Sequence, residues 1–285
     1  MREPTENAWF QPDRIYRPGG RTVIERSSLL ERMAVAAPVI SPARYDAAIF
    51  DLDGVVTDTA SMHAAAWRRL FDDYLASRPD RAGENRLPFT DEDYRRYVDG
   101  RSRYDGVRVF LASRRITEDP PAVQALGDRK DEYFRESVKQ HGVRVFDGTV
   151  VLLRSLRAAG IRVAIISASR NCVEVLKAAS LDDMFEVRVD GVVAGELGLP
   201  GKPDPAVFLE AARRLQVTPN RAVVVEDALA GVAAGRRGGF GLVIGVDRTG
   251  HPDELRAAGA DLVVQDLAEV KLTGVAAAEP GKIEP

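Results

Sequence analysis

The sequence predicts an α/β fold: a Rossmann-like parallel sheet with helices on both faces, into which an all-helical cap domain is inserted. Short apolar runs of strand length alternate with helical patterns, which is typical of βαβ units and a parallel sheet. Residues 61–142 break this alternation, because they carry helical patterns and no convincing strand. This stretch follows the first apolar run, so we expect a helical insert after the first strand.

Five apolar, β-branched runs are the expected strands, each about the length of a buried strand. They are AAIFD (47–51), RVAIIS (162–167), AVVVE (222–226), LVIGV (242–246) and DLVV (261–264). Helical patterns separate them and should cover both faces of the sheet. These patterns are TVVLLRSLRAAG (149–160), CVEVLKAASL (172–181), AVFLEAARRL (206–215) and ALAGVAAGRRG (228–238).

The insert is expected to be a cap of helices joined by Gly/Pro-rich loops. Its helices are expected over 61–76, 90–98, 104–114 and 122–140. The core domain then consists of residues 45–60 and 143–272. Residues 1–44 are polar and Pro/Gly-rich apart from a short helical pattern at 23–35, and we expect a partly disordered extension there. We expect a flexible tail over 273–285.

Composition narrows the class of protein. The net charge of the 285 residues is −3 with both signs interspersed, which does not point to nucleic acid or a membrane surface as partner. The one cysteine, Cys172, excludes an intrachain disulfide and suits a reducing compartment. The N-terminus has no apolar signal-peptide core and no run is long enough to span a bilayer. We expect a cytoplasmic monomer.

Polar side chains stand where three expected strands end and in one loop before a helix. Ligands of open parallel sheets bind beyond the carboxyl ends of the strands, so we expect these side chains to meet at one rim. They are Asp51, Asp53, Ser167, Lys202, Glu226 and Asp227.

Each of these groups has a chemical reason to be there. A carboxylate can attack a phosphoryl group, and Asp51 is the expected nucleophile that forms an aspartyl-phosphate. Asp53 is the expected general acid and base. Lys202 and the Ser167 hydroxyl are expected to hold the oxygens of the transferred group. Close carboxylates also need a cation, and oxygen ligands with phosphate select Mg²⁺. Its expected ligands are Asp51, Asp53, Glu226 and Asp227.

Each signal alone also has an ordinary structural explanation. D-x-D-G is a common turn sequence, and Ser167 could simply cap the next helix. Lys202 could be a solvated loop lysine, and Glu226–Asp227 could favour a helix N-terminus. The joint occurrence of these signals at successive strand ends favours a catalytic site, because four ordinary explanations would otherwise have to hold together.

The sequence resembles the haloacid dehalogenase superfamily over about Tyr45–Leu267. Four stretches carry the resemblance: FDLDGV (50–55), IISAS (165–169), GKPDP (201–205) and VVVEDALAGVAAG (223–235). It implies a Rossmann-like core, an aspartyl-phosphate intermediate, Mg²⁺ and a helical cap after the first motif. The dehalogenases of the superfamily usually lack an aspartate at the position of Asp53, which favours phosphoryl transfer.

A closer resemblance is to the β-phosphoglucomutase subfamily. Its first loop, its cap pattern G-x-S-R, its cap pair R-K and its S-A-S-K-N motif all have counterparts, with Arg170 in place of the lysine. The matching residues are Asp51, Asp53, Gly54, Val55, Asp58, Thr59, His63, Trp67, Gly100, Ser102, Arg103, Arg129, Lys130, Ser167, Ala168 and Asn171.

The subfamily resemblance implies roles for the cap and hinge residues. Thr59 and His63 would serve the hinge and position Asp53, Arg103 would grip the non-transferring phosphate, and Lys130 would contact the sugar. Gly100, Ser102, Ala168 and Asn171 would belong to the same substrate-binding set, with Ser167 and Lys202 at the transferring site. Ordinary readings are open here too, since a single basic residue is most often solvated and His63 could be a boundary histidine.

The resemblance implies conversion of β-glucose 1-phosphate to glucose 6-phosphate through a bisphosphate, with glucose 1,6-bisphosphate as activator and a small phosphorylated sugar as partner. Cap closure about hinges near 57–58 and 140–144 would keep water from the aspartyl-phosphate. Two alternatives remain: a phosphatase of a small sugar or polyol phosphate, and, more remotely, a non-catalytic binding protein on the same fold.

Overall fold

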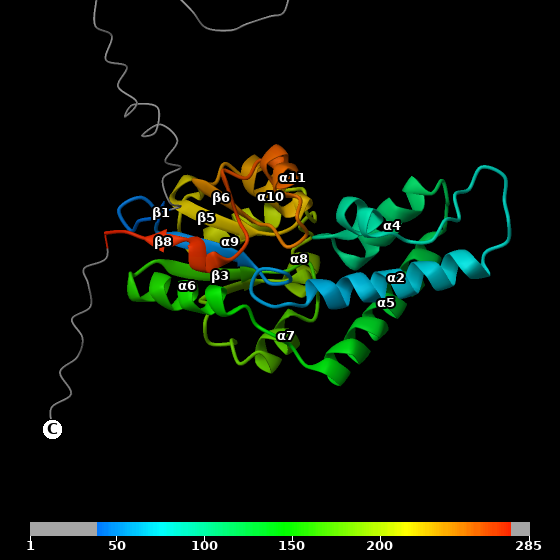
Figure 1. The fold of residues 1–285 in the computed structure, drawn as a ribbon, viewed down its shortest axis with the longest axis horizontal. Coiled ribbons are helices and arrows are strands. Elements are labelled where there is room, and N and C mark those ends of the chain that lie inside the picture. The colour runs from blue at the N-terminus through cyan, green and yellow to red at the C-terminus, as the bar shows by residue number, and fades with distance from the viewer. Residues whose placement is uncertain (1–38, 275–285) are drawn as a thin grey trace, which may run out of the picture. The chain divides into compact units, whose positions relative to one another are not determined.

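The computed structural model describes residues 39–274. The helical pattern expected at 23–35, most of the expected extension and nearly all of the expected tail lie outside these residues. Within residues 39–274, six parallel strands form one sheet with helices on both of its faces, and a group of helices lies at one end of it (Figure 1). The α/β fold with a helical cap is therefore confirmed.

All neighbouring strands of the sheet run parallel, with β2 at its centre. The strands in spatial order are β4 (Val187–Val189), β3 (Arg162–Ile166), β2 (Ala47–Asp51), β5 (Ala222–Glu226), β6 (Leu242–Val246) and β7 (Leu262–Val264). The chain adds strands on one side of β2 and then continues on the other side with β5. The order thus reverses between β2 and β5, and the crevice at such a reversal is where ligands bind in open α/β sheets.

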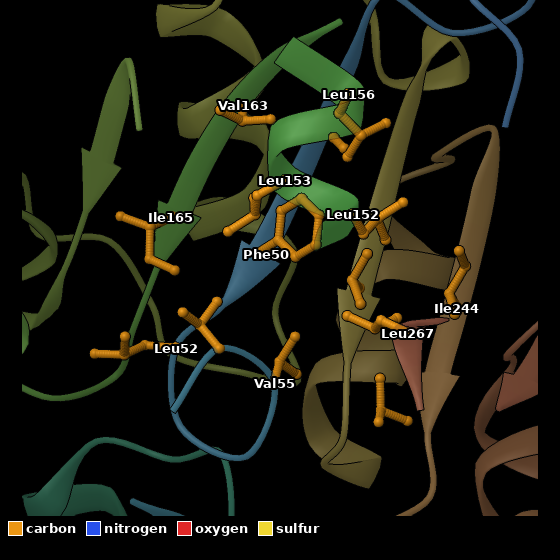
Figure 2. Close-up of a cluster of buried hydrophobic side chains, with 14 of the residues drawn as sticks. Phe50, Leu52, Val55, Leu152, Leu153, Leu156, Val163, Ile165, Ile244 and Leu267 are labelled. Carbon is orange, nitrogen blue, oxygen red and sulfur yellow. The ribbon is translucent and has the colours of Figure 1, made fainter. Parts of the chain in front are cut away.

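Alternate residues of each strand pack on opposite faces of the sheet, as the two-residue period of a strand requires. On one face, Phe50 packs with Leu153 of α6 and Ile165 of β3 in a buried cluster (Figure 2). The helices of the core domain in this cluster are α6 (Asp147–Ala158) and α7 (Cys172–Ala178). On the other face, Ile49 packs with Phe208 of α9. The helices there are α9 (Ala206–Arg214), α10 (Leu229–Arg237) and α11 (Pro252–Ala258).

The cap has its own apolar core, built around Trp67, Phe71 and Phe110. Its elements follow β2 directly, as expected, and include a π-helix, η1, where a plain helix was expected. They are α2 (Ala60–Ser77), α3 (Asp91–Asp93), η1 (Tyr94–Val98), α4 (Arg103–Ser113) and α5 (Pro120–His141). The exact boundaries predicted for the cap, 61 and 142, remain a proposal.

The two crossings between core and cap lie side by side. Thr57 and Val145 form an isolated antiparallel bridge, and the Asp58 N–H donates to the Arg144 carbonyl at 2.9 Å. The side chains of Asp58 and Arg144 form an ion pair at 2.8 Å. Both crossings coincide with the predicted hinge segments.

Several elements were missed because their sequences are short or glycine-rich. The glycine-rich stretch before Lys202 holds β4 and the short helix α8 (Gly191–Glu196), neither of which was among the expected elements. Two 3₁₀ turns, η2 (Pro219–Arg221) and η3 (Leu267–Glu269), complete the core. The strands β1 (Val39–Ile40) and β8 (Lys271–Leu272) pair in parallel in a small separate sheet. Part of the expected extension is therefore strand.

Candidate active site

The polar residues predicted at the strand ends meet at the reversal of strand order. Asp51 is the last residue of β2, Ser167 follows β3, and Asp227 follows β5. Because neighbouring parallel strands end at the same edge of a sheet, these side chains converge although they are far apart in sequence. The cap lies over this edge (Figure 1).

Asp51 forms a buried triad with Lys202 and Glu226. The Lys202 ammonium donates to Asp51 Oδ1 at 2.5 Å and also to Glu226 Oε1. The other Asp51 oxygen accepts from the Asp53 backbone N–H at 2.9 Å. Burial raises the pKa of Asp51 above its usual range, and the nearby carboxylates add to this while the Lys202 ammonium opposes it. Lys202 is therefore the group that opposes protonation of the candidate nucleophile.

Asp53 is held by hydroxyl donors and approached by an imidazole. Its oxygens accept from the hydroxyls of Thr59 and of Ser167, the latter at 3.1 Å. His63 Nε2 lies 3.2 Å from Asp53 Oδ1, without the alignment of a hydrogen bond. Burial alone would raise the pKa of Asp53, but the charges and hydrogen bonds around it outweigh burial and lower it. Asp53 is thus an ionised carboxylate, ready to accept a proton.

His63 joins Asp53 to the cap lysine. Lys130 Nζ contacts His63 Nδ1, and the imidazole stacks on Phe134 with ring centroids 3.8 Å apart. Burial lowers the pKa of Lys130 to about 7, with Asp53 and Asp131 opposing the shift and Arg103 adding to it. A neutral imidazole between the two accepts from Lys130 at Nδ1 and carries its proton on Nε2. These contacts therefore connect Lys130 of the cap, through His63, to Asp53, the candidate acid and base.

Gly54 brings the turn after β2 against the end of β5. Its φ is +85°, and a Cβ there would lie 1.7 Å from Asp227 Oδ2, so only glycine fits. Arg248, in the loop after β6, donates to the Gly54 carbonyl at 2.8 Å. The turn that carries Asp51 and Asp53 is thereby fixed against Asp227.

The donor set fits a hard divalent cation. Burial raises the pKa of Asp227, and Asp99, Glu226 and Asp51 add to this shift, so negative charge here exceeds what Lys202 compensates. Oxygen ligands in such excess suit Mg²⁺. Within residues 39–274, however, no three His, Cys, Asp or Glu side chains converge closely enough to hold an ion alone. Backbone or substrate oxygens would have to complete the shell.

The four predicted metal ligands differ in how far they fit this role. Asp51 and Asp227 line the cavity together, and Asp53 lies beside them. The Glu226 carboxylate is fully buried and already accepts from Lys202 and, at 2.7 Å, from the Ala228 N–H. These contacts favour a positioning role for Glu226, which orients Lys202 toward Asp51.

On the cap side, Asp131 gathers the groups expected to bind the distal phosphate. Arg103 pairs with Asp131 Oδ1 at 2.7 Å, and Asn171 of the core donates to the same oxygen at 2.7 Å. Arg135 pairs with the other oxygen at 2.5 Å. Asp131 is buried and so ties cap to core in this structure. Arg103 is therefore a paired cation in this structure.

A cavity of about 50 Å³ between core and cap brings most of the predicted residues together. From the predicted set, its lining includes Asp51, Asp53, His63, Gly100, Arg103, Lys130, Ala168 and Asp227. The others stand behind this lining or beside it: Thr59, Ser102, Ser167, Asn171, Lys202 and Glu226. Ser102 caps the N-terminus of α4 by accepting from the Asp105 N–H. An adjoining cavity of about 260 Å³ is lined by Arg103, Ser167, Arg170 and Lys202, among others.

Sequence reasoning missed several polar residues of the cavity lining, among them Tyr94, Asp99, Arg101 and Ser169. It also missed Asp131, whose neighbour Lys130 had been singled out. The pair Asp131–Arg135 has the i, i+4 spacing of an ordinary surface ion pair, so nothing in the sequence marked Asp131 as buried. Burial raises the pKa of Asp99 to about 7, which marks it as a cap carboxylate facing the acidic cluster.

Comparisons with known proteins found relatives of this chain. A family model described as haloacid dehalogenase-like hydrolase matches residues 45–239. A protein named beta-phosphoglucomutase from Mycobacterium bovis is 48% identical over 242 residues, 80% of this chain and 92% of that protein. An uncharacterised glycosyl hydrolase from Mycobacterium tuberculosis is 40% identical over 252 residues, 86% of this chain and 19% of that protein.

Among solved structures, the crystal structure of a beta-phosphoglucomutase from Clostridium difficile resembles this fold with a TM-score of 0.66 and 27% identity. The match covers 80% of this chain and 93% of that one. No helix within residues 39–274 is both long and apolar enough to cross a membrane.

Proposed function

The chain belongs to the haloacid dehalogenase superfamily, in its β-phosphoglucomutase-like subfamily, and we propose that it is an Mg²⁺-dependent mutase that converts β-glucose 1-phosphate to glucose 6-phosphate through an aspartyl-phosphate on Asp51. Similarity to the Mycobacterium bovis protein of that name supports the substrate. We further propose that it works in the cytoplasm with glucose 1,6-bisphosphate as activator.

One observation carries the proposal: the cavity that contains Asp51 and Asp53 is closed on its other side by cationic cap residues. Arg103 and Lys130 line the same cavity as the two aspartates. A plain phosphatase needs cations only around the phosphate that it removes. A mutase also needs a cation for the second phosphate of the bisphosphate, remote from the nucleophile, and the cap supplies it.

In the first transfer, phosphorylated Asp51 donates its group to the free hydroxyl of β-glucose 1-phosphate. Asp53, ionised in this structure, accepts the proton of that hydroxyl. Lys202 lies against Asp51 and supplies positive charge to the moving phosphoryl group. Bound Mg²⁺, held by Asp51 and Asp227, would neutralise charge on the phosphoryl oxygens.

In the second transfer, the bisphosphate has turned over and its other phosphate returns to Asp51. Asp53 then gives its proton to the oxygen of the leaving sugar, which reverses its earlier role. Water has to be kept from the aspartyl-phosphate between the two transfers. The contact between Asn171 of the core and Asp131 of the cap supports a closed state that excludes it.

Phosphorus NMR tests the proposal directly. The purified protein is mixed with β-glucose 1-phosphate, Mg²⁺ and a trace of glucose 1,6-bisphosphate. We expect a growing glucose 6-phosphate signal, with the α anomer untouched. Growth of inorganic phosphate instead would identify a phosphatase, and no change in any signal would favour a non-catalytic protein.

The nucleophile is tested by substitution. Asp51→Asn should abolish turnover, because an amide cannot form the acyl phosphate, while the circular dichroism spectrum stays that of the native fold. Asp80→Asn, at an exposed loop position, is the matched control and should keep full turnover. Turnover near the native rate in Asp51→Asn would reject this assignment.

A further inference from the structure

We propose that His251, which none of the motif resemblances includes, is a positioning residue that helps to keep water from the aspartyl-phosphate. It does so through a hydrogen bond with Arg95, which closes one flank of the joint between core and cap. The inference rests on the proposed function and deepens it, because it assigns the exclusion of water on this flank to a named pair. Arg95 lies in η1 of the cap, and His251 ends the loop 247–251 between β6 and α11.

Two polar contacts between cap and core flank the cleft. Asn171, whose side chain contacts Asp131 of the cap, follows β3, and His251 follows β6. In the sheet, β3 and β6 lie on either side of the central pair β2 and β5, whose ends carry Asp51 and Asp227. Because parallel strands end at the same edge of a sheet, the two contacts hold the cap on both flanks of the cleft.

The contact between Arg95 and His251 has one possible direction. Arg95 Nη1 lies 2.7 Å from His251 Nε2. A guanidinium only donates, so the imidazole accepts at Nε2 and carries its proton on Nδ1, which lies 3.9 Å from Glu254 Oε1 of α11. The other terminal nitrogen of Arg95 donates to Glu92 of the cap. Glu92 therefore orients the guanidinium that reaches the core.

The loop that carries His251 is fixed to the core. Three consecutive N–H groups, the last of them that of His251, donate to the buried carboxylate of Asp247 at 2.8–3.1 Å. Arg248 of the same loop donates to the carbonyl of Gly54 at 2.8 Å. Gly54 belongs to the turn that carries the two catalytic aspartates. His251 is therefore presented to the cap from a segment that is tied to the active-site turn.

A small cavity beside the pair adjoins the active site. Its volume is about 50 Å³, and both Arg95 and His251 line it. Asp99 and Asp227 line this cavity and also the cavity that contains Asp51, so the two cavities meet at these carboxylates. The pair therefore covers a passage on this flank, and its separation would admit water toward Asp227 and the nucleophile.

The pair acts on access of water and stays away from the reacting atoms. In the part of the chain that the structure describes, the lining of the cavity with Asp51 and Asp53 includes neither Arg95 nor His251. Loss of the pair should therefore leave phosphoryl transfer itself intact. It should instead increase hydrolysis of the aspartyl-phosphate, because the acyl phosphate meets water whenever the cap moves away.

Phosphorus NMR of the mutase reaction measures the inorganic phosphate released for each glucose 6-phosphate formed. His251→Ala should raise this ratio roughly fivefold, the factor that corresponds to a hydrogen bond worth about 1 kcal/mol. His251→Gln keeps a hydrogen-bond acceptor and should restore the ratio to within about twofold of wild type. Asp253→Asn is the control, because Asp253 lies next to the pair on α11 with its side chain 96% exposed. It should leave the ratio unchanged.

Acrylamide quenching of Trp67 fluorescence reports cap opening without turnover. Trp67 is buried and lines the cavity between core and cap, and in a Trp9→Phe background it is the one tryptophan of the chain. His251→Ala should increase the quenching constant, and His251→Gln should not. Arg95→Met should give the same increase as His251→Ala. The double variant should give no more than either single one, because both substitutions break one contact.

An unchanged phosphate ratio or unchanged quenching in folded His251→Ala would overturn the inference, as would an equal change in Asp253→Asn. Melting temperatures show whether His251→Ala is folded, and Arg95→Met takes its place if it is not. If the NMR experiment identifies a phosphatase, quenching alone decides: an increase in His251→Ala keeps the role of the pair although the proposed function fails. Mutase activity with unchanged quenching rejects the pair and leaves the proposed function standing.

Discussion

Gly231→Ala should destabilise the protein although alanine is the better helix former. Gly231 lies in the first turn of α10, where a glycine-to-alanine change would normally stabilise by about 0.5–1 kcal/mol. A Cβ at this position, however, would lie 1.7 Å from Glu226 Oε1 and 2.0 Å from its carboxyl carbon. The carboxyl group must move, and it is completely buried.

The cost of that movement follows from the contacts of Glu226. Overpacking a buried site typically costs about 1–3 kcal/mol. The carboxylate also loses alignment with the Lys202 ammonium and with the Ala228 N–H, and hydrogen bonds to charged groups are each worth about 1.5–3 kcal/mol. Counting the overpacking and the loss of one of these two hydrogen bonds, and subtracting the propensity gain, we expect a net loss of roughly 2–5 kcal/mol in the free energy of unfolding. Turnover should fall too, since Lys202 loses the partner that orients it.

Urea unfolding followed by circular dichroism measures this effect, and Gly195→Ala is the matched control. Gly195 lies in α8, and a Cβ there would meet no atom within 4 Å. The control should therefore be stabilised slightly, by about 0.5–1 kcal/mol, so that the two substitutions differ in sign. If Gly231→Ala were stabilised as much as the control, Glu226 would not be confined as described and its positioning role would be wrong.

Three other predictions concern buried charges of the site. Lys202→Met leaves two buried carboxylates without their cation and should lower the free energy of unfolding by about 3–5 kcal/mol in urea with EDTA present; an unchanged value would show that the ammonium is not needed there. Lys130 has a pKa of about 7 when folded and 10.5 when unfolded, so the unfolded chain binds more protons in between and stability should rise with pH from about 7 to 10. In Lys130→Met this rise should shrink by as much as about 1.4 kcal/mol per pH unit relative to wild type, whereas Lys139→Met on the exposed side of α5 should keep it. Asp131→Asn removes the carboxylate shared by Arg103 and Arg135 and should lower the free energy of unfolding by about 1.5–3 kcal/mol in the same assay. Asp128→Asn is its control and should change this free energy by about zero; equal losses for both variants would contradict the role of Asp131 in joining the two arginines.

The strands and helices with clear hydrophobic patterns were predictable from the sequence. All five expected strands are present, because buried parallel strands need continuous apolar, β-branched runs. The elements that were missed lack this signal. Strand β4 is three residues long, and α8 contains two glycines, so tertiary contacts decide their conformation.

The candidate site was predictable where it depends on motif residues at strand ends. Topology brings Asp51 and Asp227 together, and topology follows from the alternation of strands and helices. The pairing of Arg103 with Asp131 was not predictable, because it depends on which face of α5 packs against the start of α4.

In the small β1–β8 sheet, the first and last strands of the described chain lie next to each other. Val39 pairs with Lys271 and Ile40 with Leu272, so the two ends of the described chain leave the core side by side. In Figure 1 this pair lies at the end of the sheet away from the cap. A unit with adjoining ends can be joined to other domains without disturbing its cleft. Such a unit can occur as one domain of a longer protein. This accords with the glycosyl hydrolase from Mycobacterium tuberculosis, in which the segment that matches this chain makes up only 19% of the protein.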